Sequence, residues 1–206
     1  TGEWALAWAR SAILNSVQAA GRVPRKLDAK ARIDSAGGRI DVFTMLVHHD
    51  IPGMFQPLGG LLGAFLNEEG SPGVIVTTQR QLPVQRLTAA HELGHAVLGH
   101  TPSFDPEEIL RKSPFVQREQ GRYDIQEIQA NAFASQLLIP RWLLAKHVQR
   151  QQWTPDDLLN PAVVYQLSLR IGASYTATCY ALAQIEVFGA SECAKLLDVK
   201  RKTIKQ

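Results

Sequence analysis

Leu87-Thr88-Ala89-Ala90-His91-Glu92-Leu93-Gly94-His95 is the stretch that decides how this chain folds. Apolar residues recur through it at helical spacing, Pro83 precedes it and Gly99 follows it, which predicts one helix with a broad buried face. Residues four apart on an α-helix lie about 40° from each other around the axis. His91 and His95 therefore project from the same face, where two imidazoles can bind one metal ion.

Glu92 stands beside the two histidines and completes an H-E-x-x-H pattern. Burying such polar side chains is costly unless a partner compensates, and a metal ion provides that partner. Zinc lowers the pKa of a water molecule toward ~7, and an adjacent carboxylate can take the proton as the water attacks a carbonyl. The pattern thus predicts a zinc-dependent peptidase with Glu92 as the general base. The alternative is a helix whose histidines only form hydrogen bonds in the core.

A third ligand is needed, and His100 is unsuited to that role. It lies nine residues after His91, about 180° around the same helix. We expect it to interact with the last carbonyls of this helix instead.

A second helix supplies a better candidate for the third ligand, Glu127. It would complete a His₂Glu site with one position left for water and substrate. Asn131 follows four residues later on the same face and could orient a ligand histidine. The rival acids Glu107, Glu108 and Glu119 lie in a polar, proline-containing stretch less suited to rigid placement.

The first helix together with 127–134 and 137–140 resembles the ImmA/IrrE family of metallopeptidases. That family typically shows A-H-E-L-G-H and then E-x-E-A-N-x-F-A-x-x-L-L-M-P. Here Gln129 replaces the second glutamate and Ile139 the methionine. Helical phase points Gln129 about 160° away from Asn131.

The resemblance implies a zincin-like fold, a small sheet packed on two metal-binding helices. It also implies that His91, His95 and Glu127 bind zinc, with manganese as the alternative metal, and that Glu92 is catalytic. Members of the family cleave or otherwise inactivate a helix-turn-helix transcriptional repressor, which leads to derepression. Such a repressor is therefore the expected protein partner.

The length and composition suit one domain with a small appendage. The chain has 206 residues, 45% of them hydrophobic, and a net charge of +3. No apolar run reaches the ~18 residues of a membrane span, and no signal peptide is visible. Two widely spaced cysteines fit a reducing compartment, so we expect a cytoplasmic protein without membrane contact.

The coarse pattern predicts an α+β fold in two parts: a zincin-like domain over 1–145, including N-terminal helices, and a helical region over 146–206. Expected helices lie at 4–20, 27–36, 83–98, around 127–138, and at 142–148, 162–171 and 174–188; expected strands lie at 39–47, 61–66 and 73–78. The polar stretch 101–124 is expected to be irregular, and it could line the cleft or act as a lid. Tyr123 is a candidate to stabilise the oxyanion.

The segment 167–174 resembles a family segment with helix-turn-helix character. The helix after it offers Tyr175, Thr176, Thr178, Tyr180 and Gln184 but no Arg or Lys. This favours packing or protein recognition, with DNA contact as the weaker alternative. A rival function is a non-proteolytic zinc-containing regulator that binds a repressor or DNA through these helices. The intact Glu92 counts against it.

Overall fold

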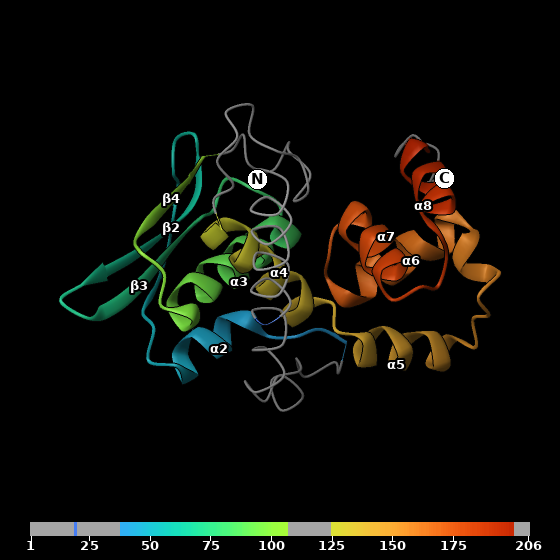
Figure 1. Cartoon of the computed structure of the whole chain (residues 1–206), viewed down its shortest axis with the longest axis horizontal. Coiled ribbons are helices and arrows are strands. Elements are labelled where there is room, and N and C mark those ends of the chain that lie inside the picture. The colour runs from blue at the N-terminus through green and yellow to red at the C-terminus, as the bar shows by residue number, and fades with distance from the viewer. Residues whose placement is uncertain (1–18, 20–37, 107–124, 200–206) are drawn as a thin grey trace, which may run out of the picture.

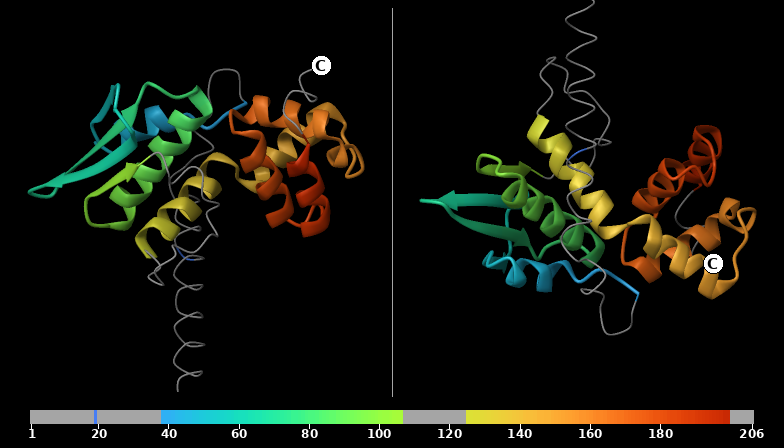
Figure 2. Two further views of the ribbon diagram at one scale, coloured as in Figure 1. Left: turned by 90° about the horizontal axis from the view of Figure 1, so that it is seen from above. Right: turned by 60° about the horizontal axis from the view of Figure 1, so that its bottom comes forward.

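The computed structural model describes residues 19, 38–106 and 125–199 (Figure 1). A sheet with three helices forms one part of the molecule, and α-helices from the last third of the chain form the other (Figures 1 and 2). The fold is α+β, as predicted. Apart from residue 19, the helices expected at 4–20 and 27–36 lie outside the described residues.

The sheet has four strands in the order β1-β3-β2-β4. Their bounds are Gly53–Gln56 (β1), Leu61–Glu68 (β2), Ser71–Thr77 (β3) and Ser103–Pro106 (β4). β2 pairs antiparallel with both β3 and β4, while β1 pairs parallel with β3. The strands predicted at 61–66 and 73–78 are confirmed as β2 and β3. β1 and β4 were not predicted, and β4 occupies part of the stretch expected to be irregular.

The strand predicted at 39–47 is wrong, because α2 (Val42–His48) is a helix. The Asp41 side chain accepts hydrogen bonds from the Thr44 amide and hydroxyl, which caps the first turn. Val42, Met45 and Leu46 are buried at the helical spacing i, i+3, i+4. This cap and the helical spacing of the buried residues favour a helix more strongly than the β-branched composition favours a strand.

The two helices that carry the motif residues are α3 (Leu82–Leu98) and α4 (Ile125–Leu138). α3 packs on β2 and β3 and also against α4, so it lies between the sheet and α4. Gly94 marks the crossing of α3 and α4. A Cβ there would lie 3.0 Å from Phe133 Cδ1 and 3.3 Å from Ala130 Cα. The glycine thus permits the close approach on which the site depends.

The last third of the chain is helical. Its elements are α5 (Arg141–Gln151), the 3₁₀ helix η4 (Asp157–Leu159), α6 (Pro161–Ile171), α7 (Tyr175–Gln184) and α8 (Ala190–Asp198). The predicted helices at 142–148, 162–171 and 174–188 correspond to α5, α6 and a shorter α7. Asn160 and Ser174 cap α6 and α7 by accepting hydrogen bonds from amides of the first turn. α8 was not predicted.

One hydrophobic core runs through both parts. Its buried members include Val76 of the sheet, Leu93 of α3 and Leu167 of α6. Arg86 of α3 is buried and donates hydrogen bonds to the carbonyls of Ile171 (3.4 Å) and Gly172 (3.1 Å) at the end of α6. The boundary after residue 145 stays a prediction. Within the described ranges, no helix has both the length and the apolar character to span a membrane.

Candidate metal centre

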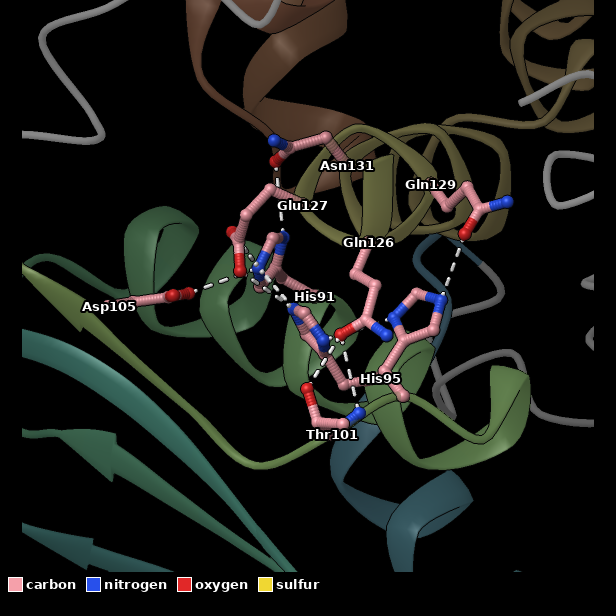
Figure 3. A network of polar contacts seen from close by, with 9 residues as sticks. His91, His95, Thr101, Asp105, Gln126, Glu127, Gln129 and Asn131 are labelled. Atoms are coloured by element: carbon pink, nitrogen blue, oxygen red, sulfur yellow. Dashed lines mark hydrogen bonds and ion pairs between the residues drawn. The ribbon is translucent and has the colours of Figure 1, made fainter. Parts of the chain in front are cut away.

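His91, His95 and Glu127 converge between α3 and α4 (Figure 3). Their Nε2 and carboxylate atoms lie close together: 3.0 Å between the two Nε2 atoms, 3.2 Å from His91 Nε2 to Glu127 Oε2, and 3.5 Å from His95 Nε2 to Glu127 Oε1. The structure therefore brings together the three residues that the sequence singled out as ligands.

These separations suit a single ion. A tetrahedral zinc site with bonds of about 2.0–2.1 Å has ligand–ligand distances of roughly 3.3 Å. The observed 3.0–3.5 Å match that spacing. Both histidines are buried, with exposed fractions of 4% and 1%, so their donor atoms face a site largely shielded from solvent. The chemistry and the geometry of the donor set fit a divalent cation.

Asn131 lies one turn beyond Glu127 on α4 and contacts the first histidine. Its Oδ1 is 3.1 Å from His91 Nδ1. An amide oxygen can only accept, so His91 Nδ1 donates its proton to Asn131, and Nε2 is the nitrogen that faces the cluster. The structure thus places Asn131 where the helical spacing suggested, on the outer nitrogen of a ligand candidate.

Glu92 is fully buried on the sheet side of α3. Gly63 of β2 makes room for it, because a Cβ at that position would lie 2.5 Å from Glu92 Oε1. Among the described residues, neither Glu92 oxygen has a hydrogen-bond donor when the nearby carboxyl groups are ionised. A buried carboxylate in this condition needs a positive charge or a proton.

Asp105 is a member of this site that the sequence did not reveal. It lies on β4 directly opposite Gly63, is buried, and places Oδ2 3.1 Å from His91 Nε2. A single aspartate in a polar stretch gives no local signal. Only the pairing of β4 with β2 brings it to the cluster.

The electrostatics of the cluster also favour a cation. Burial lowers the pKa of His91, but hydrogen bonds to Asp105 and Glu127 outweigh it and raise the pKa to about 10. Burial, reinforced by Asp105, raises the pKa of Glu92 far above its usual range. Burial and the neighbouring His91 lower the pKa of His95 to about 3. The metal-free cluster therefore retains protons on His91 and Glu92, which a divalent cation would replace.

His100 lies outside the cluster of His91, His95 and Glu127, and its backbone amide donates to a helix-end carbonyl, that of His95, at 3.0 Å. Its side chain contacts other residues. Its Nδ1 lies 3.1 Å from His95 Nδ1, and its Nε2 lies 3.1 Å from Gln129 Oε1. Gly99 ends α3 in the left-handed conformation (φ 70°), so helical phase no longer applies beyond it. Glu107, Glu108, Glu119 and Tyr123 lie outside the described residues.

Comparison with known proteins places the chain in a family. Residues 48–183 match the IrrE N-terminal-like domain, peptidase family M78. The chain is also 24% identical over 120 residues to an uncharacterized immunity region protein 2 of Bacillus phage phi105. That alignment covers 58% of this chain and 63% of the phage protein, so the chain spans less than two thirds of its relative. With the motif, the metal cluster and the family match in agreement, the chain belongs to the IrrE N-terminal-like family of metallopeptidases.

Proposed function

We propose that this chain is a zinc-dependent endopeptidase that cleaves a regulatory protein, with a helix-turn-helix transcriptional repressor as its substrate. The observation that carries the proposal is the buried Glu92 carboxylate beside the cluster of His91, His95 and Glu127. A structural zinc site is closed by four protein ligands, so it has no use for an additional acid, such as Glu92, that does not bind the metal.

Each side chain has a distinct part in the proposed reaction. His91, His95 and Glu127 hold the metal, and Asn131 keeps His91 in the tautomer that can ligate. When bound, zinc polarises the peptide carbonyl and lowers the pKa of water. Glu92 removes a proton from the attacking water while the water oxygen forms a bond to the carbonyl carbon. Glu92 then delivers that proton to the amide nitrogen as the C–N bond breaks.

The regulatory substrate has separate support. Family membership accounts for hydrolysis alone. The phage relative is named as an immunity region protein, which favours a role in controlling gene expression for this chain as well. The resemblance to repressor-inactivating peptidases points the same way. Cleavage of the repressor would derepress the genes it controls.

Glu92→Gln tests the proposal, because the amide keeps the shape of the side chain but cannot accept the proton. Zinc-loaded protein would be incubated with purified helix-turn-helix repressors and with unrelated proteins, and the products identified by mass spectrometry. We expect Glu92→Gln to slow cleavage by about 10²–10⁴-fold while its zinc content stays at the wild-type level.

Glu68→Gln, an exposed change at the end of β2, is the matched control and should cleave normally. Cleavage by Glu92→Gln at the wild-type rate would overturn the mechanism. Efficient cleavage of the unrelated proteins alone would overturn the assignment of the substrate.

A further inference from the structure

His100 forms a second polar layer behind the candidate metal ligand His95. After the left-handed Gly99, the His100 amide hydrogen-bonds to the His95 carbonyl at 3.0 Å. This turn brings the two imidazoles together, with 3.1 Å between their Nδ1 atoms. His100 is also buried, with an exposed fraction of 7%. The contact therefore lies in the interior and is shielded from competing water.

Helix α4 fixes the position of this second layer. Gln129 Oε1 lies 3.1 Å from His100 Nε2. Two bonds hold the next residue: the Thr101 amide and hydroxyl donate to Gln126 Oε1 at 3.3 Å and 2.9 Å (Figure 3). Two glutamines of α4 thus clamp the segment that follows α3, and one of them reaches the imidazole directly.

The order of donors and acceptors along this chain of contacts determines a tautomer. The Gln129 amide oxygen accepts, so His100 Nε2 carries a proton and donates it. A neutral His100 then has a bare Nδ1, which accepts from His95 Nδ1–H. With its proton on Nδ1, His95 has a lone pair on Nε2, the atom that faces His91 and Glu127.

The reverse order would disable the site. If position 129 donated to His100 Nε2, the His100 proton would move to Nδ1 and point at His95. His95 would then carry its proton on Nε2, where a metal has to bind. The side chain at residue 129 therefore determines which nitrogen of His95 is available.

We propose that His100 and Gln129 are positioning residues that hold His95 in its metal-binding tautomer. This inference rests on the proposed function only in taking the cluster as a metal site, and it does not depend on the substrate. It also gives a role to the glutamine that departs from the family pattern, since a glutamate at 129 would present the same acceptor. Carbonyl and carboxylate partners of ligand histidines typically change metal affinity by 10–100-fold when removed.

The test compares zinc affinity, measured by competition with a chromophoric chelator, across four variants. Gln129→Met removes the acceptor with little change of shape, and His100→Phe removes the link itself. We expect both to weaken zinc binding by about 10–100-fold. Gln129→Glu keeps an acceptor at this position and should bind zinc with an affinity close to that of the wild type. Gln136→Met, further along α4 and half-buried, is the matched control and should bind zinc normally.

Nitrogen-15 NMR of the histidine rings tests the tautomer without any metal. In zinc-free wild-type protein we expect the His95 proton on Nδ1, and in Gln129→Met a mixture of both tautomers. Finding the proton on Nε2 in the wild type, or unchanged zinc affinity in Gln129→Met, would overturn the inference. Failure of the wild type to bind zinc would instead overturn the proposed metal site, so the two failures are distinguishable.

Discussion

At the scale of single residues, Gly63 is where the sheet comes closest to Glu92. A Cβ there would lie 2.5 Å from both Glu92 Oε1 and Thr88 Cγ2 and 3.0 Å from the Ile75 carbonyl oxygen. We expect Gly63→Ala to lower the free energy of unfolding by about 1–3 kcal/mol through overpacking, and to slow hydrolysis by displacing Glu92. Chemical denaturation measures the loss. Gly59→Ala is the control, because a Cβ there meets no atom within 4 Å; equal unfolding of the two variants would contradict the prediction.

The titrating residues of the cluster predict how the metal-free protein responds to pH. Folding raises the pKa of His91 from 6.5 to about 10, and that of Glu92 from 4.5 to about 10. From about pH 6.5 to 10 the folded state thus holds more protons than the unfolded state, and its stability falls as pH rises. His95, with a pKa lowered to about 3, is neutral in both states over most of this range.

We therefore expect the melting temperature of chelator-treated protein to decrease across this range. Zinc-loaded protein should not show the decrease, because the metal replaces the same protons. Scanning calorimetry of both forms provides the measurement. In the metal-free Glu92→Gln variant, the melting temperature should depend less steeply on pH. A metal-free melting temperature that rises with pH would refute the assignment of protons.

The proposed ligands could be predicted because they follow local rules. His91, His95, Glu127 and Asn131 depend only on which residues share a face of a helix. Asp105 could not, because it reaches the site through strand pairing between distant segments. The side-chain contacts of His100 could not be predicted for a related reason: a single left-handed residue before it redirects the chain. Helical periodicity fails one residue past the end of the helix.

At the scale of elements, the spacing between α3 and α4 determines whether the ligands meet. Gly94→Ala would place a methyl group against the Phe133 ring and force the helices apart. We expect a loss of about 1–3 kcal/mol in stability and weaker zinc binding, since Glu127 sits on α4. Phe133→Leu, with a smaller side chain, should make the same substitution less costly. A double-mutant cycle measures this coupling, and purely additive effects would show that the helices tolerate the methyl group.

The elements themselves were predicted where their patterns were long. α3 and α4 have apolar repeats over several turns, whereas β1 is four residues long and exposed throughout, so it has no alternation to detect. The α2 segment is short and apolar, and its Asp41 cap decides between helix and strand. α8 buries only Cys193 and Leu196 among its nine residues, and this short apolar pattern was not recognised as a helix.

At the scale of the whole molecule, Arg86 joins the metal-binding helix to the C-terminal helices. Its guanidinium is buried against the last carbonyls of α6, while the half-buried Arg39 donates to neighbouring carbonyls of α6. We expect Arg86→Leu to cost about 1.5–3 kcal/mol, because buried acceptors lose a charged donor. Arg39→Leu should cost less. Denaturation curves compare the free energies of unfolding of the two variants, and limited proteolysis within 161–199 should be faster in Arg86→Leu. Similar losses of stability in both variants would mean that the burial of Arg86 adds no stability.

The long separation between Arg86 and its acceptors has a consequence for biosynthesis. These carbonyls lie 85 and 86 residues later in the chain. At roughly 5–20 residues per second, a ribosome needs roughly 4–17 s to make that stretch. During this interval the nascent chain gains both histidines and then Glu127, yet the guanidinium of α3 still lacks its acceptors. Translation that stops after residue 127 but before residue 171 thus yields a polypeptide with every proposed ligand but without either carbonyl that accepts from Arg86.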